Sequence, residues 1–373
     1  MITKKIDKIR LGVVGLGRGL QSVLDIIIDD DVELVAICDK NPEMVEKARK
    51  QLKDEFGLEG VKEYLDFEEF LKADTNTVVI ATDAVMHVPF VTKAMDAGKN
   101  VLSEIPAVNS LEEAKALKKA VASHPELKYM CGENDCFLGY IEAWKAMYEE
   151  GKFGDIVYAE GEYLHTKDYR SYKAEDYKDG HWRTYNPAIK YCTHDLGPLL
   201  YIMNDRPVSV SCMVPDVHYN PYKKDSYVEN AVMLVKTAKG AVIRIWICFG
   251  AYVGYTHNYA MYGTRGMIEV DKSKSRTEAH CKARFSDTPS SFDGEKIDVP
   301  ITVFSFQDGK GKSHLGIDRK MMRAFFNSIK EDTRPPIDVD LGIRMALAGI
   351  LAHESYLQGG AAIAIPDPED FEI

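Results

Sequence analysis

The chain has 373 residues, of which 45% are hydrophobic and 28% are charged, and this length predicts two domains because it exceeds what one hydrophobic core usually serves. The formal net charge of −11 excludes nucleic acid as an expected partner, because an acidic protein repels the phosphodiester backbone. The sequence contains no apolar run of membrane-spanning length and no CxxC pair among its seven cysteines, so we expect no membrane partner, reduced thiols and a cytoplasmic location.

Strand and helix patterns alternate along the first 130 residues. We expect strands at 10–15, 33–38, 77–82 and 100–103, and helices at 19–29, 41–56, 85–97 and 110–122. Pro42 suits the first turn of the second helix, Gly98 suits the end of the third, and Ser110 is a typical N-cap. Repeated strand–helix units predict a parallel sheet with right-handed crossovers.

The pattern changes near residue 130. A helix is expected at 138–150, followed by strands at 156–165, 208–214, 227–237, 241–249 and 258–262, and by helices at 318–330 and 341–356. Alternating apolar residues in the strands indicate an antiparallel sheet. The predicted fold class is therefore α/β, with a parallel-sheet domain over residues 1–130 and an α/β domain with a mostly antiparallel sheet over residues 131–373.

A glycine turn follows the first expected strand and opens the first expected helix. Gly15 and Gly17 allow a tight turn and a close approach of the backbone to a pyrophosphate at the helix N-terminus. The third glycine of the G-x-G-x-x-G pattern is replaced by Leu20. Asp39 follows the second expected strand, where a carboxylate can accept hydrogen bonds from the ribose hydroxyls of NAD. The turn alone would also suit a plain strand–helix junction, but the combination favours NAD as the cofactor.

Several segments resemble the Gfo/Idh/MocA oxidoreductase family: Gly15-Leu-Gly17, Ala36-Ile-Cys-Asp39, Thr82-Asp83 and the run from Gly98 to Pro106. The resemblance implies an N-terminal Rossmann domain, a C-terminal α/β domain with a large and mostly antiparallel sheet, and NAD near the domain junction. It also implies a homo-oligomer paired through the open face of the second sheet. The expected cofactor-binding residues are Gly15, Gly17, Arg18, Gly19, Asp39, Thr82, His87, Glu104 and Pro106.

The chain departs from this family at one position. Members commonly carry Glu-Lys-Pro where this sequence has Glu104-Ile105-Pro106, and the lysine lies near the reacting carbinol in the dehydrogenases. Isoleucine has no donor, acceptor or charge. Either another residue handles the proton, or the protein has lost the chemistry and only binds NAD or a sugar.

Further segments resemble the branch of this family formed by NAD-dependent α-N-acetylgalactosaminidases, which hydrolyse a glycoside without net redox change. They are Glu133-Asn134, Tyr163-Leu-His165 and the run from Tyr191 to Pro198. The resemblance implies a redox-neutral glycosidase, and a net dehydrogenase of a sugar, cyclitol or glycoside stays open as an alternative. The implied catalytic residues are Glu133, Tyr163, His165, Tyr191 and His194.

These residue types suit the chemistry. A histidine can take the hydroxyl proton when the sugar is oxidised at C3, and the ketone then acidifies the hydrogen at C2. We assign the carbinol proton to His194 with Tyr191, the C2 proton to Tyr163, and help to the leaving group or water to Glu133 or His165. Each residue alone would also fit a structural role, such as a helix cap near His194 or a core-lining ring on a strand.

The segment 166–190 is rich in aromatic residues, namely Tyr169, Tyr172, Tyr177, Trp182 and Tyr185. Aromatic rings pack on the C–H faces of a sugar or glycoside substrate, and they are also enriched at subunit interfaces; the sequence leaves both open. No histidine, cysteine or carboxylate spacing typical of a metal centre occurs, so no metal is expected.

Overall fold

The computed structural model describes residues 6–165, 186–217, 228–251, 253–273, 280–287, 297–299 and 316–372. The aromatic residues at 169–185, which were expected to pack on a sugar or to line a subunit interface, lie outside the described residues. The chain folds into two compact units. The first comprises Met1–Phe137, Phe306–Gly342 and Phe371–Ile373, and the second comprises Leu138–Ser305 and Ile343–Asp370.

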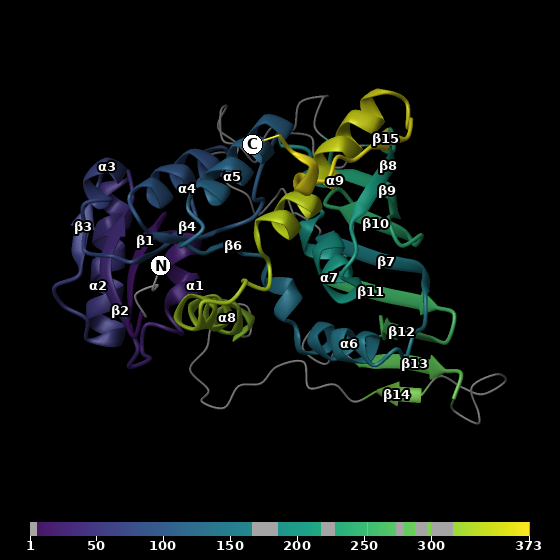
Figure 1. Ribbon diagram of the computed structural model, residues 1–373, viewed down its shortest axis with the longest axis horizontal. Helices are drawn as coiled ribbons and strands as arrows, with labels where there is room; N and C mark the ends of the chain where they lie inside the picture. The colour runs from purple at the N-terminus through teal and green to yellow at the C-terminus, as the bar shows by residue number, and fades with distance from the viewer. Residues whose placement is uncertain are drawn as a thin grey trace. The chain divides into compact units, whose positions relative to one another are not determined.

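A parallel sheet forms the centre of the first unit. In the described part of the chain its six strands follow the order β3-β2-β1-β4-β5-β6, and every pairing is parallel (Figure 1, purple to blue). The central strands β1, β4 and β5 are mostly apolar and, except for the half-buried Arg10 in β1, fully buried, as expected for a sheet covered on both faces. The strands are β1 Ile9–Val14, β2 Val32–Cys38, β3 Lys62–Tyr64, β4 Thr77–Ile80, β5 Asn100–Ser103 and β6 Tyr129–Cys131.

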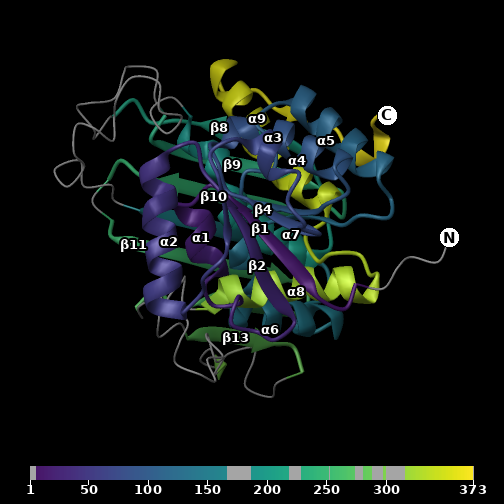
Figure 2. The ribbon, with the colours of Figure 1, turned by 90° about the vertical axis from the view of Figure 1, so that its left-hand side faces the viewer.

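Helices lie on both faces of this sheet. The strand order reverses between β1 and β4, so right-handed crossovers place α1 and α2 on one face and α4 and α5 on the other (Figure 2). Ser110 caps helix α5 as predicted, since its side chain accepts a hydrogen bond from the backbone N–H of Glu113. The helices are α1 Arg18–Val23, α2 Pro42–Phe56, α3 Phe67–Phe70, α4 His87–Asp96 and α5 Leu111–Ser123, with short 3-10 turns at η1 Ala84–Met86 and η2 Asn134–Phe137.

A late segment of the chain returns to the first unit. Helix α8, Ile317–Glu331, packs against α1 and η2, and it buries one apolar face that includes Phe325 and Phe326. Its opposite side carries Arg323, which pairs with Asp29 and Asp31. The division expected at residue 130 assigned this segment to the second domain, whereas its apolar face and its ion pairs hold it in the first unit.

The second unit is built on a large sheet. In the described residues nine strands follow the order β14-β13-β12-β11-β7-β10-β9-β8-β15, and all pairings are antiparallel except that of β7 with β10. The predicted fold class is therefore confirmed. The strands are β7 Ile156–His165, β8 Pro207–Met213, β9 Asn230–Thr237, β10 Val242–Cys248, β11 Tyr255–Gly263, β12 Gly266–Val270, β13 Cys281–Phe285, β14 Ile297–Val299 and β15 Ile363–Ala364.

One face of this sheet is covered by helix. Helix α7, Thr193–Met203, packs on β7, β10 and β11, and α6, Gly139–Glu149, packs on α7. The long helix α9, Val339–Leu357, begins in the part of the chain assigned to the first unit and ends in the second. The remaining turns are η5 Ala188–Tyr191 and η8 Pro368–Asp370. Alternate residues of the strands therefore point to a buried face beneath α7 and to an opposite, open face.

Candidate functional site

The turn between β1 and α1 requires glycine at two positions and leaves a third open. Gly15 has a φ of 89°, and a Cβ there would lie 2.3 Å from the carbonyl oxygen of Ala81. A Cβ at Gly19 would lie 2.8 Å from the Cβ of Ala81. Around Gly17, in contrast, a Cβ would meet nothing within 4 Å. The fold explains Gly15 and Gly19, whereas the open side of Gly17 leaves the backbone free to approach a ligand.

Asp39 is fixed beside this turn. Its Oδ2 accepts a hydrogen bond of 2.9 Å from the backbone N–H of Leu16, and its Oδ1 accepts one of 2.9 Å from that of Asn41. The carboxylate is half-buried, and each oxygen keeps a second lone pair for another donor. An oriented carboxylate at the end of β2 beside a glycine turn fits the ribose of a dinucleotide. The residues present therefore fit NAD.

Arg18 is held by two carboxylates of the first unit. Its Nη2 lies 3.0 and 2.9 Å from the two carboxylate oxygens of Asp318, and its Nε lies 3.6 Å from Oε1 of Glu104. Asp318 is fully buried and also accepts a hydrogen bond of 2.9 Å from Asn134. No pattern in the sequence indicated Asp318, because only the return of α8 brings it to the glycine turn.

His87 connects the segments that follow β4 and β5. Its Nδ1 lies 2.9 Å from the carbonyl oxygen of Pro106, and its Nε2 lies 3.2 Å from that of Thr82. Burial lowers the pKa of His87 and outweighs the opposing effect of these two carbonyls. The ring is therefore neutral near pH 7 and donates to one carbonyl at a time. It holds Thr82 and Pro106 in place, and both were predicted to contact the cofactor.

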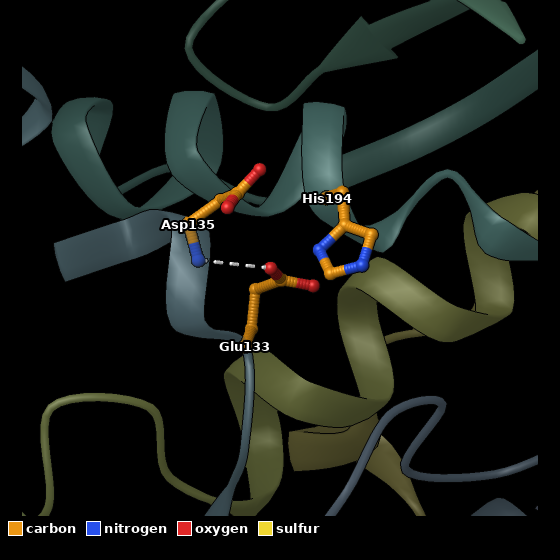
Figure 3. A group of neighbouring side chains, drawn as sticks. All are labelled: Glu133, Asp135 and His194. Carbon is orange, nitrogen blue, oxygen red and sulfur yellow. Dashed lines mark hydrogen bonds between the residues drawn. The ribbon is translucent and has the colours of Figure 1, made fainter. Parts of the chain in front are cut away.

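Glu133 follows β6 in the first unit. It is buried, and its Oε1 accepts a hydrogen bond of 3.2 Å from the backbone N–H of Asp135 (Figure 3). Its neighbour Asn134 donates to Asp318. The loop that carries Glu133 is thus tied to the same buried carboxylate that holds Arg18.

The other predicted catalytic residues gather in the second unit. Tyr163 and His165 lie on β7, Tyr191 ends η5, and His194 lies in the first turn of α7 (His194 is drawn in Figure 3). The ring of His194 meets that of Tyr163 edge-on, with centroids 5.6 Å apart and an interplanar angle of 84°. The centroids of Tyr191 and His194 lie 6.3 Å apart, and those of Tyr163 and His165 lie 6.0 Å apart. These rings form one cluster on the face of the sheet beneath α7.

Strand pairing adds residues to this cluster that the sequence did not reveal. His257 stands directly opposite Tyr163 in the β7–β11 register, and Tyr255 stands opposite His165. The rings of His257 and Tyr163 are stacked, with centroids 4.2 Å apart and an interplanar angle of 26°. The predicted strand began at residue 258, whereas β11 begins at Tyr255. The alternation of Tyr255 and His257 was a usable strand signal, but their register with β7 was not.

Comparison with known proteins bears on both units. Residues 9–132 match the model of the oxidoreductase family with an NAD-binding Rossmann fold, and residues 141–269 match the Gfo/Idh/MocA C-terminal domain. The chain belongs to the Gfo/Idh/MocA oxidoreductase family. Residues 216–370 also match the C-terminal domain of glycosyl hydrolase family 109. The predicted family, its NAD cofactor and its class as an NAD-dependent enzyme are therefore confirmed.

The individual similar proteins include both glycosyl hydrolases and a dehydrogenase. A glycosyl hydrolase family 109 protein of Shewanella amazonensis is 27% identical over 98% of this Gfo/Idh/MocA chain and 87% of its own. An α-N-acetylgalactosaminidase of Tannerella forsythia is 25% identical over the same shares, 98% and 87%. Among solved structures, scyllo-inositol dehydrogenase from Lactobacillus casei, with bound NAD(H) and scyllo-inositol, aligns with a TM-score of 0.75 at 20% identity, covering 96% of this chain and 99% of that one. Within the described residues, no helix has the length and apolar character needed to cross a membrane.

Proposed function

We propose that this protein hydrolyses a glycoside in a redox-neutral cycle: oxidation at C3 of the sugar, elimination of the aglycone, addition of water and reduction. The observation that carries the proposal is the single cluster formed by Tyr163, His165, Tyr191 and His194. These groups would transfer the protons in place of the family lysine, whose position is occupied here by Ile105. The match of residues 216–370 to the family 109 domain supports the same reaction.

The first unit would hold the cofactor. Bound NAD⁺ supplies a hydride acceptor for the carbinol carbon and later returns the hydride. Gly17 would admit the pyrophosphate, and Asp39 would accept hydrogen bonds from the adenosine ribose, while Arg18 offers a positive charge anchored by Asp318. The full set proposed to bind the cofactor is Gly15, Gly17, Arg18, Gly19, Asp39, Thr82, His87, Glu104 and Pro106.

His194 and Tyr191 would move the proton of the C3 hydroxyl. An imidazole accepts a proton near neutral pH, so a nitrogen of His194 takes the hydroxyl proton as the C–H bond breaks. The first turn of α7 is held to the sheet because the hydroxyl of Tyr259 donates to the backbone oxygen of His194 at 2.5 Å. That contact orients the helix turn from which the imidazole projects.

Tyr163 would remove the C2 proton once the C3 ketone has acidified it. The ring of His257 stacks on the ring of Tyr163, and the rings of His194 and Phe249 pack against it edge-on. A ring held in this way presents its hydroxyl oxygen in one position, which favours proton transfer over a short distance. His165 or Glu133 would then assist the leaving aglycone and the incoming water.

The deciding experiment mixes the purified protein with a panel of aryl glycosides in D₂O and follows aglycone release and reduced-cofactor absorbance together. We expect aglycone release with deuterium at C2 and no net reduced cofactor. Tyr163→Phe should slow C2 exchange by about 10²- to 10⁴-fold, the usual contribution of a general base. Tyr158→Phe is the matched control, because Tyr158 lies on the same strand and its hydroxyl instead donates to Glu160.

Two outcomes would overturn the proposal. Accumulation of reduced cofactor without aglycone release would identify a net dehydrogenase of a sugar, cyclitol or glycoside. Absence of both signals with every glycoside, while NAD still binds, would identify a protein that binds NAD or a sugar without turnover.

We further propose that the open face of the nine-stranded sheet joins two copies of the chain. Met213, Val232 and Trp246 stand in one row across β8, β9 and β10, and the neighbouring Leu234 is 50% exposed. Exposed apolar side chains in adjacent rows suit an interface between subunits. Light scattering should give a dimer or larger mass, which Leu234→Asp should lower; a monomer mass for the unmutated protein would refute this.

We propose a cytoplasmic location as well. All seven cysteines are buried and free, which suits a reducing compartment. Cell fractionation of the native host with an antibody to the protein would test this, and recovery outside the cytoplasm would refute it.

A further inference from the structure

The first turn of α7 lies unusually close to the sheet. Gly161 stands opposite Tyr259 in the β7–β11 register, and a Cβ at Gly161 would lie 2.8 Å from both the Cβ and the backbone oxygen of Asp195. Any side chain at position 161 would push the helix away. This close approach brings the carboxylate of Asp195 within reach of β11.

Two residues on the same face of β11 hold this turn. Tyr259 binds the backbone oxygen of His194, as described above, and Nδ1 of His257 lies 3.3 Å from Oδ1 of Asp195. His257 and Asp195 are both buried, with 3% and 0% of their surfaces exposed. The carbonyl group of His194 and the side chain of the next residue, Asp195, are therefore both tied to β11.

His257 also touches the proposed base on β7. It stacks on Tyr163 and meets His194 edge-on, with centroids 5.6 Å apart. One imidazole thus contacts the ring of Tyr163, the ring of His194 and the carboxylate next to His194. We propose that His257, anchored by Asp195, is a positioning residue that sets Tyr163 and His194 in the relative geometry that the two proton transfers require.

The chemistry of the pair explains why a histidine and a carboxylate suit this place. An ionised Asp195 can only accept, so it holds the proton of His257 on Nδ1 and fixes the tautomer and the ring plane. The other nitrogen can then bind a proton, and a positive charge stacked on Tyr163 favours the phenolate that a base requires. Among the described residues, the titratable groups facing His257 are Tyr163 from β7, Asp195 and His194 from α7, and Tyr255 on its own strand.

The inference rests on the proposed function, and its first test uses the C2 exchange assay with full-length variants. His257→Phe keeps an aromatic face but loses the hydrogen bond and the charge. We expect kcat for exchange to fall by about 10²-fold, as misplacement of reacting groups by about 1 Å does, with KM and NAD affinity unchanged and the pH profile of kcat displaced. Asp195→Asn keeps an acceptor, so it should lose less activity but displace the profile in the same direction. Thr256→Ser, next to His257 on the opposite face of β11, should leave all of these unchanged.

Results that overturn the inference are distinct from those that overturn the proposed function. A His257→Phe protein with the kcat and pH profile of the unmutated protein refutes it, as does one that loses thermal stability while its pH profile stays the same. If His257→Phe does not fold, Asp195→Asn carries the same test.

A second measurement needs no turnover. In ¹⁵N NMR of the histidine rings, the unmutated protein should show His257 protonated on Nδ1, and Asp195→Asn should change that signal. No change would refute the anchoring contact whatever the activity. Absence of turnover in the unmutated protein, together with the expected His257 signal, would refute only the proposed function.

Discussion

The substitution Gly15→Ala tests the glycine turn most directly. At a φ of 89°, an alanine costs about 1–2 kcal/mol because its Cβ crowds the backbone. The new Cβ would also lie 2.3 Å from the oxygen and 2.7 Å from the carbonyl carbon of Ala81. Ala81 cannot easily retreat, since its N–H donates to Val14 at 2.8 Å. Overpacking of this kind costs about 1–3 kcal/mol, so the free energy of unfolding should fall by about 2–5 kcal/mol.

Two other glycines separate the contributions. Gly57 ends α2 with a φ of 65° and has open space around its Cβ position, so Gly57→Ala should cost only the backbone part, about 1–2 kcal/mol. Gly17→Ala meets nothing within 4 Å, so the free energy of unfolding should change by less than about 0.5 kcal/mol. Its added methyl group lies where the cofactor would approach, so NAD affinity should fall at least about tenfold, equivalent to about 1.4 kcal/mol.

Urea unfolding of the three variants gives the stability changes, and calorimetric titration with NAD gives the affinities. Equal destabilisation by Gly15→Ala and Gly57→Ala would show that the approach to Ala81 carries no energy. A Gly17→Ala protein that loses stability but binds NAD normally would refute the division of roles within the turn.

Further predictions concern charge and burial. The pKa of His87 is lowered by burial, so the unfolded chain binds more protons below about pH 6.5, and the free energy of unfolding should rise from about pH 5 to 7. Urea unfolding of His87→Gln should show a smaller rise over this range. A rise equal to that of the unmutated protein would contradict this. Burial raises the pKa of Glu162, but hydrogen bonds from Lys272, Arg244 and Asn258 outweigh it and the pKa is lowered overall. The stabilisation by ionised Glu162 is therefore present above about pH 4.3 and lost as the pH falls. In Glu162→Gln the free energy of unfolding should fall less on acidification. An equal fall in the variant and the unmutated protein would count against this. Ile105→Lys places an ammonium group where the side chain is only 8% exposed, so the melting temperature should drop and aglycone release should not become faster. Faster aglycone release would refute the assignment of proton transfer to the histidine and tyrosine cluster.

Much of the first unit could be predicted from local sequence. Its strands are short and mostly apolar, helices α2 and α5 begin at Asn41 and Ser110, which accept hydrogen bonds from their own first turns, and every crossover except the one from β3 to β4 joins neighbouring strands. The glycine turn and Asp39 follow from the same local logic, because the strand–turn–helix unit that holds a dinucleotide is contiguous in the chain.

The short runs that contain Tyr163, His165, Tyr191 and His194 resemble the α-N-acetylgalactosaminidase branch, and this resemblance made them candidate catalytic residues, a role that stays a prediction. Only the tertiary structure decided which residues far away in the chain contact Arg18 and Tyr163. Asp318 reaches Arg18 because α8 returns to the first unit, and His257 reaches Tyr163 because β11 pairs with β7 in one register. Helix capping and strand alternation are encoded within a few residues, whereas strand register and helix docking depend on burial summed over segments far apart in the chain.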